Sequence, residues 1–458
     1  MSKIEVNTVA PQCGTTLTLG ESGDTVTLGS GASQSGFGRT GTVDWQTSIK
    51  TTGFTAASGE GYFCDTSSGG FTVTLPASPS AGDIVAIKDY ANTFDTDNLT
   101  LGRNGSNIGG LAQDSIINQE GLAVTLVYAD ATKGWLVTDS GLQSEAPGPT
   151  FISATGGTIT TVDTNFKVHT FTGPGTFCVS AVGNPAGSNT ISYMVVAGGG
   201  GAGGDSGGAG GAGGFREGKT PQCTYTSSPI ACTSGSNNGM PVAATSYPVT
   251  IGGGGTGGAG APPGGSPLTG GDGSPSTFAG TTSITSTGGG GGGDRLSVDG
   301  RPGGSGGGAR TQAGGAGSGN TPPVTPSQGF DGAGATPTPT GNSGGGGGAT
   351  ALGVYNTTPA SGAGGPGGAG ATTSINGTPT AFAGGGGGGG STNPDQVGGT
   401  GGAGGGGNGV QGSAGGAPAT NAGNPGTTNT GGGGGGGADD SNGGSGGSGI
   451  VIIRYKFQ

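Results

Sequence analysis

A block of glycine constrains this chain more than any other feature. Residues 198–449 contain 94 of the 122 glycines in a chain of 458 residues. Glycine loses more backbone freedom on folding than any other residue and has no side chain to bury, so an ordered block depends on backbone hydrogen bonds. Runs of four to seven glycines recur, at 198–201, 252–255, 288–293, 344–348, 384–390, 404–407 and 431–437.

The block allows two interpretations. One is a flexible linker, which is the usual state of glycine-rich sequence. The other is a bundle of polyglycine-II helices with three residues per turn and a rise of about 3.1 Å, in which neighbouring helices exchange backbone hydrogen bonds. Runs of seven glycines exclude collagen, which needs a strict Gly-X-Y repeat. Strands predicted at 191–197 and 450–457 bracket the block, and we expect them to pair and to hold its two ends together.

Composition divides the chain into successive parts. Residues 1–40 are predicted to be a virion-attachment or assembly segment, residues 41–142 a small all-β domain, and residues 143–150 a linker. Residues 151–197 together with 450–458 are predicted to be a β framework around the glycine-rich block at 198–449. The predicted fold class is therefore all-β N-terminal domains followed by a glycine-rich polyglycine-II helix bundle with host-facing loops, framed by β-strands, with essentially no α-helix.

The small all-β domain carries the clearest strand signals. Alternation of apolar and polar residues with period two is clear at 71–75 and 124–128, and turn residues separate the runs. Trp45 and Trp135 are the two tryptophans of the chain, and we expect both to anchor the core of this domain. In the β framework, strands are predicted at 157–160, 167–171 and 175–179.

Composition and charge exclude several classes of function. The net charge is −11, and no basic patch points to nucleic acid. No run of about 18 apolar residues predicts a membrane span, and the N-terminus has no apolar stretch typical of a signal peptide. We therefore expect synthesis in a host cytoplasm without a signal peptide. The sequence contains no cofactor motif. Glycine-rich matches to phosphate-binding loops arise by chance in such a chain and do not indicate a cofactor.

The sequence predicts no catalytic and no metal-binding residues. His169 is the single histidine and lies inside a predicted strand, so we expect a structural role for it. Without a second histidine it cannot anchor a metal site, and any Ser/His/Asp triad would depend on this one residue. Asp439 and Asp440 are expected in a solvated loop, and no pair of acids is placed as a glycosidase needs. The chain is predicted not to be an enzyme.

Three segments resemble a known family. These are Lys167–Phe177 (KVHTFTGPGTF), Tyr193–Gly201 (YMVVAGGGG) and Gly446–Tyr455 (GGSGIVIIRY). In this order they resemble the glycine-rich domain of bacteriophage tail fibres, a resemblance that covers residues 151–458. The start of the chain (MSKIEVNTV) is similar to the N-terminal regions of such fibres. The resemblance implies a virion appendage, often a homotrimer, whose terminal loops touch the host surface. It supplies no catalytic residues.

The candidate binding residues lie between the glycine runs. Aromatic side chains on loops of a rigid scaffold are common anchors for recognition, and Tyr225, Phe330 and Tyr355 are the predicted receptor-binding residues. Cys223 and Cys232 flank a short segment and are expected either to form a disulfide or to remain two thiols.

Three functions follow from these observations. The first is a phage tail-fibre adhesin in the virion tail, with other tail proteins and a bacterial surface glycan or outer-membrane protein as partners. The alternative is a structural subunit of a virion or extracellular filament that binds no receptor. A polysaccharide depolymerase is a third hypothesis, and no motif supports it.

Overall fold

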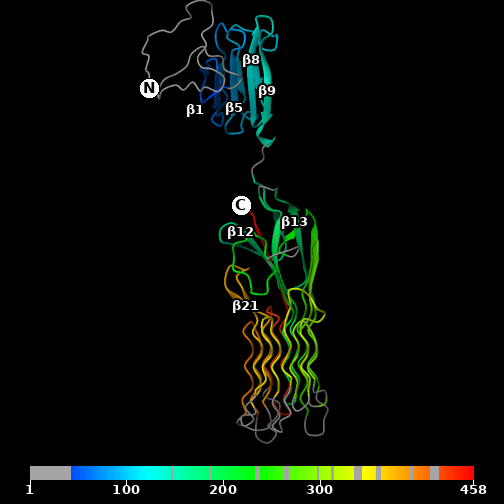
Figure 1. Ribbon diagram of the computed structural model, residues 1–458. Helices are drawn as coiled ribbons and strands as arrows, with labels where there is room; N and C mark the ends of the chain where they lie inside the picture. The colour runs from blue at the N-terminus through cyan, green and yellow to red at the C-terminus, as the bar shows by residue number, and fades with distance from the viewer. Residues whose placement is uncertain are drawn as a thin grey trace, which may run out of the picture. The chain divides into compact units, whose positions relative to one another are not determined.

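The computed structural model describes most of the chain as two compact units, unit 1 (Met1–Pro147) and unit 2 (Gly148–Gln458), which Figure 1 shows. The described residues are 43–145, 149–184, 187–232, 238–261, 268–294, 296, 299–310, 314–334, 343–356, 363–390, 396–412 and 422–458. They are almost entirely strand or irregular, with one 3-10 turn, η1 (Gln143–Glu145), in the predicted linker. The predicted assembly segment at 1–40 lies outside the described residues.

Unit 1 contains two sheets, and its first six strands alternate between them. The larger sheet has the order β1-β3-β5-β8-β9, formed by β1 (Asp44–Lys50), β3 (Glu60–Cys64), β5 (Ile84–Asp89), β8 (Leu122–Asp130) and β9 (Gly134–Leu142). The smaller has the order β2-β4-β6-β7, formed by β2 (Phe54–Thr55), β4 (Thr72–Thr74), β6 (Leu99–Gly102) and β7 (Ser115–Ile117). Neighbours among the first six strands pair in parallel, whereas β7, β8 and β9 pair antiparallel with the strands before them in each order.

The core of unit 1 lies between its two sheets. Val85 and Leu126 from the larger sheet pack with Val73 and Leu101 from the smaller, around a fully buried Trp135. The expectation for Trp135 is therefore confirmed, but that for Trp45 is wrong. Trp45 lies on the edge strand β1 with 41% of its surface exposed and contacts the Phe63 ring at a centroid distance of 4.9 Å.

Unit 2 is framed by two larger sheets and one hairpin. One sheet has the order β10-β13-β17-β18-β19, formed by β10 (Ser153–Thr155), β13 (Gly175–Ala181), β17 (Ser246–Thr250), β18 (Ser276–Ala279) and β19 (Ser283–Ser286). The second has the order β11-β12-β22-β14-β15, formed by β11 (Thr158–Val162), β12 (Phe166–Phe171), β22 (Ile450–Lys456), β14 (Thr190–Val196) and β15 (Phe215–Gly218), with β16 (Met240–Pro241) also paired to β14. The hairpin consists of β20 (Ala371–Thr373) and β21 (Thr380–Phe382).

The predicted pairing of the two bracketing strands is confirmed. β14 and β22 lie side by side and antiparallel, from Ser192 opposite Arg454 to Val196 opposite Ile450. Both strands are buried on both faces, because odd-numbered residues such as Val195 pack toward the first sheet and even-numbered ones toward the hairpin. Strands buried in this way show a nearly continuous apolar run, which is why the sequence marks them so clearly.

Short strands also lie inside the glycine-rich block, where the sequence analysis predicts loops. The pieces around Phe278 and Ile284 form the β18–β19 hairpin, and those around Ile375 and Phe382 form the β20–β21 hairpin. The sequence does not predict these two hairpins for a local reason. Each of these strands has only three or four residues, which is too short for a period-two pattern to stand out.

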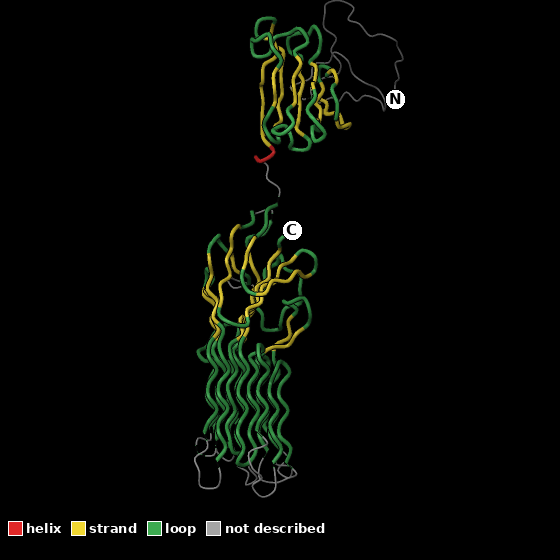
Figure 2. The backbone as a smooth tube through the Cα atoms, turned by 180° about the vertical axis from the view of Figure 1, so that it is seen from behind, coloured by secondary structure: helices red, strands yellow, loops and turns green. Residues whose placement is uncertain are grey.

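The glycine-rich stretches leave the sheets as extended arms that lie side by side, the green segments in Figure 2. The first two arms, 198–204 and 207–214, follow β14 and precede β15. Along arm 198–204 the N–H groups donate in turn to three different arms, and every third residue returns to the same arm. Its carbonyl groups accept from three further arms with the same period. The six arms bonded to it are 207–214, 252–260, 268–275, 288–293, 431–437 and 441–449.

The position of an arm in the array, buried or at the surface, is related to the pattern of glycines in its sequence. The two longest runs of pure glycine, 384–390 and 431–437, are buried along their whole length. Arm 396–403 instead has side chains at every third position, and Val397, Thr400 and Ala403 are exposed. In this arm Gln396 is buried and the glycines lie against neighbouring arms, while Val397, Thr400 and Ala403 face solvent. Among the described residues, no helix has the length and apolar character needed to cross a membrane.

Candidate functional site

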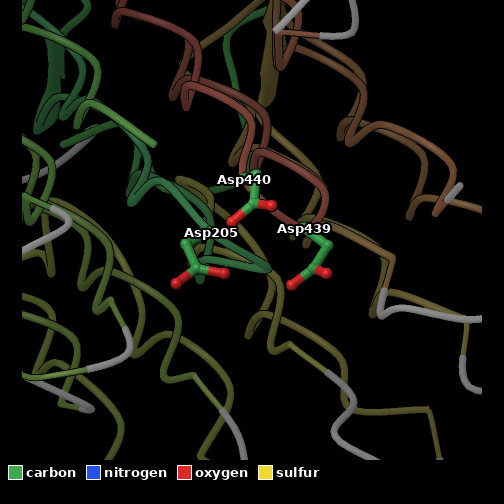
Figure 3. A group of neighbouring side chains, drawn as sticks. All are labelled: Asp205, Asp439 and Asp440. Atoms are coloured by element: carbon green, nitrogen blue, oxygen red, sulfur yellow. The ribbon is translucent and has the colours of Figure 1, made fainter. Parts of the chain in front are cut away.

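Three carboxylates meet at the end of the arms that lies away from the sheets of unit 2 (Figure 3). Asp205 lies in the turn that joins the first two arms, and Asp439 and Asp440 lie in the turn that joins the last two. A carboxylate oxygen from each residue lies within 4.8 Å of those from the other two. The Asp205 N–H donates to the carbonyl of Ser441 at 3.0 Å, which holds the two turns together.

The local sequence explains how these turns form. Asp205 and Asp440 have φ angles of 56° and 54°, in the left-handed region that aspartate adopts more readily than most residues. Asp205 is fully buried, whereas Asp439 and Asp440 are partly buried. The two turns therefore bring three acids together in a place that water only partly reaches.

The surroundings of Asp439 favour its protonated form. Burial is the largest cause of a raised pKa for this carboxyl group, followed by its hydrogen bond with Asp205 and by the negative charges of Asp205 and Asp440. The guanidinium of Arg310 acts in the opposite direction. Protonation of Asp439 thus relieves part of the repulsion within the group.

A hard divalent cation is the other species that carboxylates in this arrangement are suited to bind, because such cations prefer oxygen ligands. The sequence analysis places Asp439 and Asp440 in a solvated loop and predicts no metal ligands. It misses this group because Asp205 lies at the opposite end of the glycine-rich block. No local pattern connects the two turns, so the signal exists only in the folded array.

A second surface feature lies on three adjoining outer arms, 351–355, 363–370 and 396–403. The Val354 N–H donates to the Pro366 carbonyl at 2.9 Å, and the Gly364 N–H donates to the Val397 carbonyl at 2.9 Å, so the three arms follow one another across the surface. We call the exposed residues there the outer apolar face: Leu352 (54% exposed), Val354 (49%), Val397 (58%) and the partly buried Pro366. The described residues of these three arms include no charged side chain.

Tyr225 does not lie on an exposed loop, which corrects the expectation that its ring is available to a receptor. It is buried in the cluster beneath the second sheet of unit 2, with its ring centroid 5.1 Å from the Arg454 guanidinium. Burial is the main cause of a raised pKa for its hydroxyl group, and the charge of Glu217 adds to it. Its position beside buried Arg454 and Glu217 is that of a core residue.

Phe330 and Tyr355 are both partly buried, on neighbouring arms that the hydrogen bond from the Gly353 N–H to the Asp331 carbonyl joins. Phe330 lies near the sheets, since its N–H donates to Gly348 and the next residue along, Ala349, bonds to Ala383 beside β21. Tyr355 follows Val354 and therefore adjoins the outer apolar face. The structure thus does not bring the three predicted aromatic residues together.

Cys223 and Cys232 are two thiols, and no disulfide joins them in the described chain. The Cys223 sulfur lies beside Ser192 and 4.0 Å from the Arg454 carbonyl, whereas Cys232 lies beside Tyr193. Successive residues of a strand point to opposite faces, so Ser192 and Tyr193 place the two sulfurs on different sides of β14. Of the two alternatives in the sequence analysis, the structure contains the thiols.

His169 is fully buried and has a partner at each ring nitrogen. Nδ1 lies 2.7 Å from the Gly156 carbonyl, to which it donates, and Nε2 lies 3.1 Å from the Tyr455 hydroxyl. Burial lowers its pKa, so the neutral ring is favoured. These contacts fix the ring in the core between β12 and β22, as the predicted structural role requires.

Comparison with known proteins places the fold of unit 2. Residues 170–456, which span more than half of the chain, match the family of glycine-rich domains. The match runs from the end of β12 to the end of β22 and so covers all the arms and both bracketing strands. A search of curated proteins gives no match to the chain. On the family match, the chain belongs to the glycine-rich domain family.

Proposed function

We propose that the chain is a structural adhesin of a bacterial virus. In this proposal it is a tail-fibre protein that attaches to the virion through its N-terminal region and recognises a host cell through its glycine-rich block. Its partners are other tail proteins and a bacterial surface glycan or outer-membrane protein, and it works as a homotrimer. The observation that carries the proposal is the hydrogen-bonded array, because it gives a low-hydrophobicity chain a rigid surface for recognition.

We infer that the arms of this array are polyglycine-II helices. A polyglycine-II helix has three residues per turn, which accounts for bonds that return to the same neighbouring arm at every third residue. Fixing the backbone costs about 1–2 kcal/mol per residue, so an isolated arm would not remain ordered. Six bonded neighbours around an inner arm satisfy both its N–H and its C=O groups and offset this cost.

The outer apolar face is the surface best suited to recognition within the described residues. Exposed aliphatic groups gathered on a rigid support mark interaction sites in soluble proteins. Leu352, Val354 and Val397 provide such groups, and the adjoining Tyr355 adds a ring with a polar tip. Binding by shape and apolar contact needs no catalytic group, and we propose that the protein is not an enzyme.

A structural filament subunit is the second candidate function. The regular array favours it, since a rigid body with bonded arms is also what a filament needs. The two functions differ in whether unassembled protein binds cells in a strain-dependent way. The filament proposal requires no such binding.

The test is binding of purified, fluorescently labelled full-length protein to a panel of bacterial strains, measured by flow cytometry. We expect staining of some strains and not others. The double variant Val354→Ser/Val397→Ser should reduce this staining at least tenfold, because it replaces two exposed apolar groups by hydroxyls. Leu268→Ser is the matched control, since Leu268 is equally exposed (59%) on a different arm.

Two outcomes would overturn the proposal. Absence of staining on every strain, together with filaments in electron micrographs, would favour the structural subunit. Equal staining of all strains that the double variant does not change would show non-specific adhesion. If Leu268→Ser lowers staining as much as the double variant does, the outer apolar face is not the recognition surface.

A further inference from the structure

Side-chain oxygens, and not only backbone carbonyls, accept hydrogen bonds from the N–H groups of the arms. In each case an Asp or Asn side chain on one segment binds a glycine N–H on another, at distances of 2.6–2.9 Å. The five pairs are Asp272 with Gly291, Asp299 with Gly315, Asp331 with Gly319, Asn408 with Gly401, and Asn442 with Gly260.

Arm 314–319 shows the arrangement most clearly. In its middle, the Gly317 N–H donates to a backbone carbonyl of the neighbouring arm, that of Gly307, at 3.0 Å. On either side of it, the Gly315 N–H donates to the Asp299 carboxylate at 2.6 Å and the Gly319 N–H to the Asp331 carboxylate at 2.7 Å. Two carboxylates thus take the place that carbonyls of another arm hold in the interior.

At Gly315, the described residues leave space beside this arm. A Cβ added at Gly315 would meet no atom closer than 3.6 Å, and that atom belongs to Asp299. Inside the array the same addition would overlap a neighbouring carbonyl, as at Gly386, where the distance to the Gly434 oxygen is 1.9 Å. An arm of another molecule could approach Gly315 closely enough to bond if the carboxylate were absent.

An edge that offers N–H groups without a partner recruits further chains, as the edge strands of β-sheets do. The complementary group for such an edge is a row of backbone carbonyls with the same three-residue repeat. A second copy of this chain is the occupant that fits, because carbonyl groups along its arms accept with the same three-residue repeat, as in arm 198–204.

We propose that Asp299 and Asp331 close the edge of the array at arm 314–319 against a second copy of the chain, and that Asn408 closes the edge at arm 396–403 in the same way. The side chains keep each bundle finite by occupying the donors that a second bundle would bind. This inference concerns contact between bundles and does not depend on the proposed recognition of a host.

The experiment compares two double variants of the full-length chain. Asp299→Ala/Asp331→Ala removes both acceptors, whereas Asp299→Asn/Asp331→Asn removes the same two charges and keeps an oxygen acceptor on each side chain. Sedimentation velocity over a hundredfold range of concentration measures self-association. Hydrogen exchange, followed by mass spectrometry on peptides that contain Gly315 and Gly319, measures whether the arm stays bonded.

We expect the Ala variant to exchange these amides at least tenfold faster than the wild type at low concentration. We also expect its average mass to rise with concentration beyond that of the wild type. The Asn variant should match the wild type in both measurements. The proposal is wrong if the Ala variant keeps the wild-type mass at every concentration, or if the Asn variant associates as strongly as the Ala variant, which would make charge the cause.

A second site keeps the test decisive if the first Ala variant does not fold. Asn408→Ala removes the acceptor for the Gly401 N–H, and Asn408→Asp retains it. We expect concentration-dependent association for Asn408→Ala alone. Equal association of both Asn408 variants, or of neither, would contradict the proposal at this edge.

Discussion

At the scale of single residues, neighbours within one glycine run have different surroundings. A Cβ at Gly253 would meet nothing within 4 Å, whereas a Cβ at Gly254 would lie 1.9 Å from the carbonyl oxygen of Gly446. We therefore expect Gly254→Ala to destabilise unit 2 by about 1–3 kcal/mol, the usual cost of overpacking. Chemical denaturation of the full chain, followed in unit 2, measures this change.

Gly253→Ala is the internal control for this prediction. Its backbone does not adopt a positive φ, so alanine should be neutral or should stabilise by roughly 0.4–1 kcal/mol through the unfolded state. Equal effects of the two substitutions would mean that the arms are not packed as closely as the array requires.

Asp439 should make the stability of unit 2 depend on pH, and the direction of its pKa shift gives the sign of that dependence. Its pKa is raised above the ordinary value of 3.8, mainly by burial and then by Asp205. At a pH between 3.8 and the raised pKa, Asp439 keeps its proton in the native state and has lost it in the unfolded chain. The stability that protonation of Asp439 contributes is therefore fully present below pH 3.8 and is lost as the pH rises through the raised pKa. We expect the melting temperature of unit 2 to fall over that interval for this reason.

The variant Asp439→Asn isolates this contribution, because the amide resembles the protonated acid and cannot ionise. The difference in melting temperature between Asp439→Asn and the wild type should grow as pH rises above 3.8. Parallel curves for Asp439→Asn and the wild type would show that folding does not change the pKa of Asp439.

At the scale of elements, a buried arginine joins β22 to the β20–β21 hairpin. The Arg454 side chain is fully buried, pairs with Asp163 at 2.6 Å and lies 4.5 Å from the Phe166 ring centroid. It also donates to the carbonyls of Ser374 and Ile375 between the two hairpin strands, at 3.5 and 3.4 Å. These bonds attach the hairpin to the sheet from which the arms emerge.

Arg454→Met should therefore lower the stability of unit 2 by about 1–3 kcal/mol, since it leaves the carbonyl groups of Ser374 and Ile375 without their donor. Lys456→Met on the same strand should change it by no more than about 1 kcal/mol, because Lys456 is partly exposed. Denaturant titration gives both values, and hydrogen exchange in β20 and β21 should accelerate for Arg454→Met alone. A loss of similar size for both variants would argue against a specific role of the guanidinium.

The elements also show how far the sequence could predict the fold. The strands at 71–75 and 124–128 and the pairing of 191–197 with 450–457 were predictable, because alternation or a long apolar run marks each of them. The hairpins within the glycine block were not, since strands of three or four residues leave no window in which to see a period. Trp45 was misassigned because its place on the edge strand depends on the order of strands in the sheet.

The glycine content of an arm indicates whether the arm is buried inside the array or exposed at its surface. Surrounded arms are almost wholly glycine, with an occasional buried alanine such as Ala202, whereas arm 396–403 has exposed side chains at Val397, Thr400 and Ala403, where one side faces solvent. The meeting of Asp205 with Asp439 had no such signal. It depends on the order in which the arms pack, which is set by contacts between distant parts of the chain.

At the scale of the whole molecule, each unit has a hydrophobic core of its own. Residues around Trp135 form the core in unit 1, while two clusters on either face of the β14–β22 pair form the core of unit 2. Units with separate cores unfold separately when few contacts join them. We therefore expect two transitions in a calorimetric scan of the full chain.

The last strand completes unit 2 for a topological reason. β22 lies between β12 and β14, and its residues Val451, Ile453 and Tyr455 are buried in one cluster while Ile450 and Ile452 are buried in the other. Removing it would separate β12 from β14 and expose both clusters at once. The arms would also lose the pairing that holds the first and last of them together.

Deletion of residues 450–458 should thus abolish the calorimetric transition of unit 2 and leave that of unit 1 at its original temperature. Deletion of residues 457–458, which follow β22, should keep both transitions. Hydrogen exchange on the longer deletion should show fast exchange throughout the glycine-rich arms, because each arm depends on bonded neighbours and an isolated glycine arm cannot offset its loss of backbone entropy. If the arms stayed protected without β22, the array would be stable without its β framework, and the strands would serve to attach it and not to fold it.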